Sequence, residues 1–159
     1  MIKEKLGIKY NPNSDSGSID HNFTIDEIQD ACETHNKNVS SVLYVLSEAM
    51  HKRGDKHDWS IIQTLDDYIH AYSFSLKGEI PFEESEYFLN HAISENHHLN
   101  KFCDENVNLF DIIEFLVDQC VLHKEKAEET PQPHLMQEIL LKAFNNTAKQ
   151  IDDNLVVTL

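Results

Sequence analysis

The chain has 159 residues, 40% of them hydrophobic, and a formal net charge of −15 at pH 7. This size and apolar content predict one soluble domain with its own core and exclude a disordered chain. The negative charge excludes duplex nucleic acid and long single strands as partners, because these bind basic surfaces. A small nucleotide remains compatible, since a divalent metal ion can supply the local positive charge.

The sequence predicts a cytoplasmic protein that does not enter a membrane. Its apolar runs are short, and none approaches the roughly 20 residues that a membrane helix needs. The first residues are not followed by the apolar core of a signal peptide. The three cysteines are widely spaced without a CxxC pattern, which fits a reducing compartment; they are Cys32, Cys103 and Cys120.

Apolar spacing and end signals predict an all-α bundle of five or more helices in a single domain, residues 24–151. A flexible leader, 1–23, precedes it, and an apolar extended tail, 152–159, follows it. Thr24 and Glu27 fit a capping box. The expected helices run from Thr24 to about Met50, from Asp58 or Ser60 to Tyr72, from Phe82 to Leu99, from Asn108 to at least Leu122, and from about Pro133 to Ile151.

His57 and Asp58 form an HD dipeptide at the expected start of the second helix. An aspartate at this position caps the free amides of the helix, which would leave the histidine exposed. Alternatively, both side chains converge on metal ions. The dipeptide alone favours the cap, and only the other histidines give the metal interpretation weight.

His91 and His98 lie seven residues apart in the third expected helix, so their rings share one face to within about 20°. Such a pair can ligate adjacent metal ions, although a polar helix face is the simpler interpretation. His97 points about 120° away and is the poorer candidate unless the helix is kinked.

Two more candidate ligands interrupt apolar stripes. His35 follows Cys32 and precedes Val39, where an ionisable ring needs a hydrogen bond or a metal. Asp118 lies in the apolar run Ile112 to Leu122, and we expect it to be partly buried. A hydrogen-bonded core histidine and a solvated acidic face are the alternatives. Together the candidates supply imidazole and carboxylate ligands, which suit Mn, Fe, Ni, Co or Zn.

With these residues in place, the chain resembles the HD-domain superfamily of metal-dependent phosphohydrolases, and most closely small HD-like proteins of phages and bacteria. The resemblance covers roughly residues 30–125. It rests on His35-Asn36-Lys37-Asn38-Val39, Lys56-His57-Asp58-Trp59-Ser60, Leu89-Asn90-His91, Asn96-His97-His98 and the run from Leu109 to Asp118.

The resemblance implies an HD-like fold with one or two divalent transition metal ions. The implied metal ligands are His35, His57, Asp58, His91, His98 and Asp118, with Asp58, His91 and Lys56 as catalytic residues. The implied function is hydrolysis of a nucleotide or another small phosphate ester by metal-activated water. The alternatives are a di-iron HD-type oxygenase and a non-catalytic acidic phage-type protein that inhibits a host factor. A homo-oligomer is compatible with all three.

Overall fold

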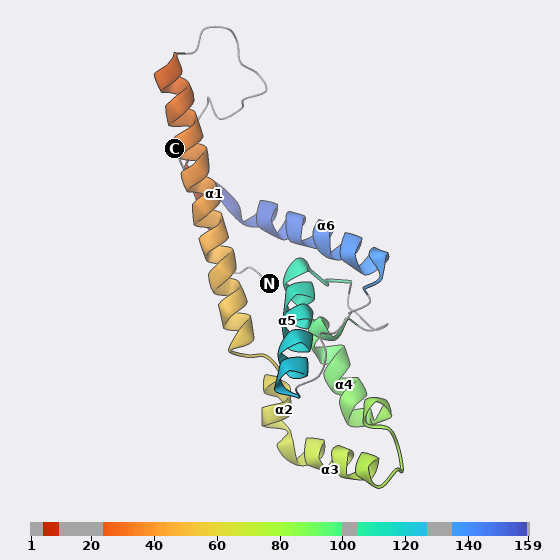
Figure 1. Cartoon of the computed structure of the whole chain (residues 1–159). Coiled ribbons are helices and arrows are strands. Elements are labelled where there is room, and N and C mark those ends of the chain that lie inside the picture. Colours follow the sequence, from red (N-terminus) through yellow and green to blue (C-terminus); the bar gives the residue numbers. More distant parts are fainter. Residues whose placement is uncertain (1–4, 10–23, 100–104, 127–134, 159) are drawn as a thin grey trace. The chain divides into compact units, whose positions relative to one another are not determined.

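The computed structural model describes residues 5–9, 24–99, 105–126 and 135–158 (Figure 1). The chain divides into two compact units, one of Met1–Lys52 with Ala148–Leu159 and the other of Arg53–Thr147. The boundaries expected at residues 23 and 151 do not coincide with this division. The predicted leader loop 11–22 lies outside the described residues.

The described residues are mostly helical, with one small two-stranded sheet, and this agrees with the all-α prediction. The elements in chain order are β1 (Leu6–Lys9), α1 (Ile25–Gly54), α2 (Trp59–Gln63), α3 (Leu65–Leu76), η1 (Phe82–Glu84), α4 (Glu86–Ser94), η2 (Asn96–His98), α5 (Leu109–Glu125), α6 (Gln137–Asn154) and β2 (Leu155–Thr158). Within the described ranges, none of these helices is both long and apolar enough to cross a membrane.

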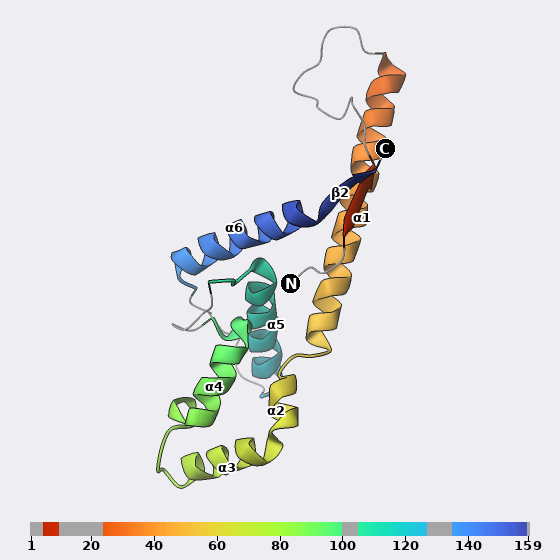
Figure 2. The ribbon, with the colours of Figure 1, turned by 180° about the vertical axis from the view of Figure 1, so that it is seen from behind.

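The first unit contains most of α1 and a small parallel sheet. The predicted capping box is present, since Thr24 Oγ1 accepts from the Glu27 amide at 3.3 Å and Glu27 Oε2 accepts from the Thr24 amide at 2.8 Å. The tail is extended as expected, because β2 pairs with β1 with Leu6 opposite Leu155 (Figure 2). β1 lies inside the segment predicted as a leader, and Leu6 is buried.

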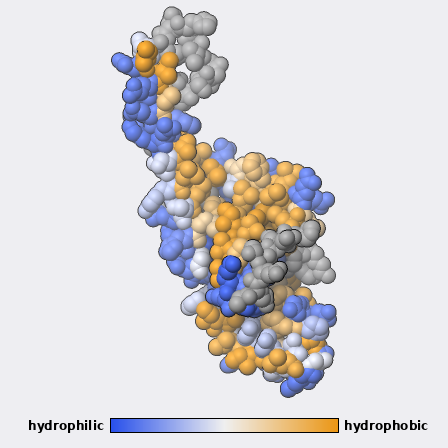
Figure 3. Space-filling model, viewed as in Figure 1, coloured by the Kyte–Doolittle hydropathy of each residue, from blue (hydrophilic) through white to orange (hydrophobic). Residues whose placement is uncertain are grey.

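The apolar stripe predicted along α1 is only partly buried. Hydrophobic and hydrophilic side chains gather on different sides of this helix (Figure 3). Its buried residues are nevertheless Ala31 and Thr34, whereas Ile28, Cys32 and Val39 of the predicted stripe are exposed. Amphipathic spacing therefore identified the helix but not the residues that it buries.

The second unit has its core where α5, α6 and the segment before α5 meet. The core is formed by Val107, Ile112, Ile139 and Ala143, with Leu99, Leu109 and Leu135 packed against it. α5 begins at a capping box in which the Asn108 side chain accepts from the Phe110 and Asp111 amides. The helix start at Asn108 agrees with the prediction, and the cap orients the first turn of the helix that carries Glu114 and Asp118.

The predicted helix from Phe82 to Leu99 is wrong as one continuous element. It is divided into η1, α4 and η2. Ser85 caps α4 by accepting from the Phe88 amide, and the backbone turns extended at Glu95, with φ −116° and ψ 101°. The second predicted helix is similarly divided at Thr64 into α2 and α3. The break at Glu95 brings both His97 and His98 into contact distance of the groups that contain Asp58.

Candidate metal centre

The turn between α1 and α2 presents His57 and Asp58. Lys56 and His57 donate their amides to the carbonyls of Arg53 and Gly54, and Asp58 then adopts a left-handed conformation, with φ 52° and ψ 24°. Asp58 occupies the N-cap position of α2, but its side chain makes no capping hydrogen bond. The cap interpretation is therefore wrong, because the carboxylate faces histidine rings instead.

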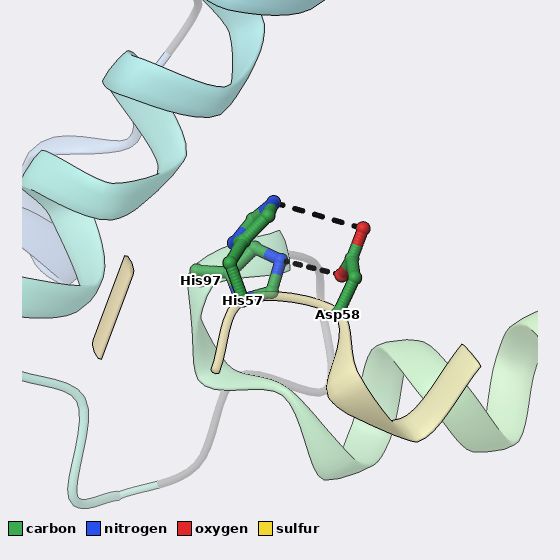
Figure 4. A group of neighbouring side chains, drawn as sticks. All are labelled: His57, Asp58 and His97. Carbon is green, nitrogen blue, oxygen red and sulfur yellow. Dashed lines mark ion pairs between the residues drawn. The ribbon is translucent and has the colours of Figure 1, made fainter. Parts of the chain in front are cut away.

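Residues from four elements meet around Asp58. Its Oδ1 lies 3.3 Å from His91 Nε2 of α4 and 3.4 Å from His97 Nε2 of η2. Its Oδ2 lies 3.6 Å from His57 Nε2. Figure 4 shows the rings of His57 and His97 facing the two carboxylate oxygens. On α5, Asp118 Oδ1 lies 3.4 Å from His57 Nε2.

Two overlapping groups of these side chains could hold a metal ion, and both include Asp58. We call His57, Asp58 and His97 the His97 group, and Asp58, His91 and His98 the His98 group. In each group, one ligand atom from every residue lies within 4.8 Å of the others. One carboxylate shared by two histidine pairs is the arrangement expected for one or two metal ions.

The separations within the His97 group suit direct coordination. Two atoms bound to a tetrahedral ion at about 2.0–2.1 Å lie about 3.3–3.4 Å apart. The Asp58 carboxylate lies 3.4 Å from His97 Nε2 and 3.6 Å from His57 Nε2. Moreover, Asp58 Oδ1 and His97 Nε2 are buried without a hydrogen-bond partner. Buried polar atoms are rarely left unsatisfied, and a cation bound by this group would satisfy both of them.

Glu114 of α5 contacts the Nδ1 side of both histidine rings in the His97 group. Its Oε1 lies 3.1 Å from His57 Nδ1 and 3.7 Å from His97 Nδ1. Arg53 donates to Glu114 Oε2 at 2.8 Å and is also paired with the buried Asp111. A carboxylate that accepts an Nδ1 proton fixes the tautomer with Nε2 free for a metal, as in carboxylate–histidine–zinc triads.

Ser60 orients the His98 group in a similar way. Its Oγ donates to Glu95 Oε1 at 3.0 Å and lies 2.9 Å from His91 Nδ1. Because the hydroxyl proton is directed to Glu95, the oxygen is free to accept from His91 Nδ1, which leaves His91 Nε2 without a proton. That atom lies 2.7 Å from His98 Nε2, so the two rings are hydrogen-bonded to one another.

The charges of the site follow from these contacts. Burial alone would raise the pKa of Asp58, but the rings of His91 and His97 hold that pKa far below its ordinary range. Burial, reinforced by His97 and His91, lowers the pKa of His98 to about 4. Burial opposes ionisation of His57, yet Glu114, Asp58 and Asp118 outweigh it and raise its pKa. At neutral pH the site therefore contains an ionised Asp58 and a neutral His98.

The structure brings together five of the six predicted ligands: His57, Asp58, His91, His98 and Asp118. Asp118 is partly buried, as expected, with 24% of its side chain exposed. His35 lies in α1 within the other unit, is exposed rather than buried in an apolar stripe, and belongs to neither group. The predicted catalytic residue Lys56 is exposed.

Four functional residues were ranked too low or missed: His97, Glu114, Ser60 and Glu95. In a continuous helix His97 would point away from His91 and His98, but η2 follows a break at Glu95, so His97 reaches the site. Glu114 had a readable signal, since it lies four residues before Asp118 on the same face of an apolar helix. Ser60 and Glu95 carry no signal in the sequence, because their roles depend on a contact between two elements.

Comparisons with protein-family models, with curated proteins and with solved structures each found no match. The resemblance to the HD-domain superfamily therefore stays a prediction from its motifs. The metal centre rests on its own geometry.

Proposed function

We propose that this protein is a metal-dependent phosphohydrolase that acts on a nucleotide or another small phosphate ester. The observation that carries the proposal is Asp58 shared between two histidine pairs. The ligand atoms are imidazole nitrogens and carboxylate oxygens, which favour Mn, Fe, Ni, Co or Zn. When bound, such ions would lower the pKa of a water and stabilise the attacking and leaving oxygens of a phosphoryl transfer.

The surrounding residues provide acceptors for the Nδ1 protons of the histidines and for the proton of a water molecule. Glu114 Oε1 accepts the Nδ1 proton of His57, and Ser60 Oγ accepts that of His91, so both rings turn Nε2 towards Asp58. Asp118 Oδ1, 3.4 Å from His57 Nε2, is placed to accept the proton that an attacking water releases. Gln119 donates to the other Asp118 oxygen at 3.3 Å.

Side-chain exposure indicates where a substrate approaches. His91 and His97 are 4% and 2% exposed, whereas Asp58 and His57 are 34% and 27% exposed. The open side therefore consists of Asp58 and His57, with Asp118 beside them. A small ester reaches these side chains, whereas a long polyanion would meet the −15 charge of the whole chain.

Among the described residues, few cations near the centre are available for phosphate. Arg53 is occupied by Asp111 and Glu114, so it supports the site rather than the substrate. Lys56 is exposed and remains the proposed phosphate contact beside the HD dipeptide. Lys101, the other lysine near a ligand in the sequence, lies outside the described residues. Phosphate binding would therefore depend chiefly on the metal ions.

The test is a hydrolysis screen on chelator-treated protein reloaded with Mn, Fe, Co, Ni or Zn. The substrates are p-nitrophenyl phosphate and nucleoside mono-, di- and triphosphates. We expect phosphate release that requires metal and falls at least about 100-fold in Asp58→Asn, the size of effect typical of removing a central catalytic group. Asp66→Asn, which changes an exposed acid on α3, is the matched control.

Three outcomes would contradict the proposal. Metal-loaded protein that releases no phosphate from any substrate would contradict it directly. Oxygen consumption by the iron-loaded protein without hydrolysis would favour the di-iron oxygenase. Phosphate release that Asp58→Asn leaves unchanged would place the activity elsewhere or in a contaminant.

A further inference from the structure

We propose that the metal centre fills in order: the His97 group binds the first ion tightly, and the His98 group binds a second ion more weakly. This inference deepens the proposed function and rests on its metal centre, but not on its substrate. Four differences between the groups carry it: ligand spacing, unsatisfied atoms, hydrogen-bonded support and nearby charge.

The first difference is the spacing of the ligand atoms. In the His97 group, Asp58 lies 3.4 Å and 3.6 Å from the two Nε2 atoms, close to the separation of about 3.3–3.4 Å expected around a tetrahedral ion. In the His98 group, Asp58 Oδ1 lies at a similar distance, 3.3 Å, from His91 Nε2, but the two imidazole Nε2 atoms are only 2.7 Å apart. These two rings must move apart before they can share an ion.

The second difference is the hydrogen bonding that each group loses when it binds a metal ion. The two unpartnered buried atoms around the shared carboxylate are Asp58 Oδ1 and His97 Nε2. A cation at the His97 group satisfies both without breaking a hydrogen bond. A cation at the His98 group instead breaks the hydrogen bond between His91 and His98. An interaction that must be broken subtracts from the binding free energy.

The third difference is the hydrogen-bond acceptor at the Nδ1 atom of the ligating imidazoles. Glu114 contacts His57 directly with a carboxylate that is paired with Arg53. On its Nδ1 side, His91 contacts a hydroxyl, that of Ser60, which in turn donates to Glu95. An ionised acceptor makes a stronger hydrogen bond than a neutral hydroxyl and raises the basicity of the ligand more. The Nε2 of His57 is thus the better donor to a metal.

The fourth difference is charge. Asp118 lies 3.4 Å from His57 Nε2 and places a second carboxylate beside the His97 group. The His98 group contains Asp58 alone, which it shares. Once an ion occupies the His97 group, the shared carboxylate is partly neutralised and a second cation is repelled. The first binding event therefore weakens the second.

The experiment titrates the chelator-treated full-length protein with Co²⁺, followed by visible absorption and calorimetry. We expect two steps, with dissociation constants that differ by at least about tenfold. Glu114→Gln should weaken the first step about 10–100-fold, the effect typical of losing an outer partner of a ligating histidine. Glu125→Gln, an exposed acid on the same helix, is the control and should leave both steps unchanged.

The second step has its own variants. His98→Ala should remove the second step and change the dissociation constant of the first step by no more than about twofold. This change is well below the 10–100-fold loss of affinity that follows when a ligating histidine loses its outer hydrogen-bond partner. Ser60→Ala should weaken only the second step, and Ser60→Thr, which keeps the hydroxyl, should restore it. Far-UV circular dichroism of every variant shows whether it folds. The conservative Ser60 pair keeps the test decisive if Glu114→Gln does not fold.

The inference is overturned by a single binding step, by two steps of equal affinity, or by His98→Ala weakening the first step as much as the second. It can also fail separately from the proposed function. Two ordered steps without hydrolysis of any ester would support the inference and contradict phosphohydrolase activity. Hydrolysis with a single binding step would overturn the inference and support that activity.

Discussion

Asp58 combines three properties that seldom occur in one residue. It has a left-handed backbone, it occupies an N-cap position without capping, and one of its carboxylate oxygens is buried without a hydrogen bond. A left-handed conformation costs an ordinary residue roughly 1–2 kcal/mol, although aspartate and asparagine tolerate it better than most. Such strain persists where the surroundings impose it, which is common at functional sites. Here it points the carboxylate at three histidines.

The variant Asp58→Asn separates the charge of this residue from its conformation. Asparagine also accepts the left-handed region, so we expect the fold to survive. Both metal-binding steps should weaken by more than about 100-fold, beyond the effect typical of losing an outer partner, because both groups share this carboxylate. Co²⁺ titration measures the change. Near-normal affinity in this variant would mean that the ion binds elsewhere.

Protonation of two histidines should give the chelator-treated protein a stability maximum near pH 6.5. His98 faces His97 and His91, and its pKa falls from 6.5 to about 4. The unfolded state then binds more protons between these values, so stability rises with pH across that window. His57 faces Glu114, Asp58 and Asp118, and its pKa lies above 6.5. Its contribution is complete below pH 6.5 and is lost as pH rises through the folded pKa.

Urea unfolding at a series of pH values measures this profile. His98→Asn should flatten the rise on the acid side, and His57→Asn should flatten the fall on the alkaline side. His35→Asn is the control, because His35 is exposed and lies in neither group. A profile that rises steadily through pH 8 would contradict the assignment of His57.

At the scale of elements, the start of α5 connects stability to the site. Asn108 is 5% exposed and caps the helix, while Asp111 accepts from the Asn108 amide at 2.7 Å and is paired with Arg53. Arg53 in turn holds Glu114, the carboxylate that supports His57. One helix start thus orients both a capping network and the histidine ligands.

Loss of the Asn108 cap should therefore reduce the stability of the protein. Asn108→Ala removes the side-chain acceptor of the Phe110 amide, while the Asp111 amide keeps the Asn108 carbonyl, and we expect the variant to lower the free energy of unfolding by about 1–2 kcal/mol. Thr24→Ala removes the exposed cap of α1 and should cost about 0.5–1 kcal/mol, the low end for such caps. Urea unfolding compares the two. Equal losses would show that burial of the α5 cap has no effect.

These elements also show which features the sequence can predict. The capping box of α1 and the helix start at Asn108 were readable, because a cap depends on residues only a few positions apart. The end of α4 was not, since no glycine or proline marks Glu95. There the side chain of Glu95 accepts from Ser60, a contact between α2 and the α4–η2 junction. That break lets both His97 and His98 reach the site, and so periodicity alone could not place them.

At the scale of the whole molecule, the ligand order H…HD…H…H…D predicted side chains that the structure assigns to one unit, except for His35, which belongs to the other unit. All the residues of the two groups, together with Glu114, Asp118 and Ser60, belong to the Arg53–Thr147 unit. Sequence order does not reveal this, because α1 runs continuously from one unit into the next. The metal centre should therefore stabilise one unit directly and the other only as far as their unfolding is coupled.

The single tryptophan, Trp59, follows Asp58 and reports on the Arg53–Thr147 unit alone. Metal at 100 times its dissociation constant stabilises a native state by about 2.7 kcal/mol. We expect this shift in the urea transition followed by Trp59 fluorescence. Far-UV circular dichroism also reports residues 25–52 of the other unit, so its transition should shift less or divide into two. In Asp58→Asn neither signal should respond to metal. Equal shifts of both signals in the unmodified protein would show that the two units unfold as one, since stabilising either would then stabilise both.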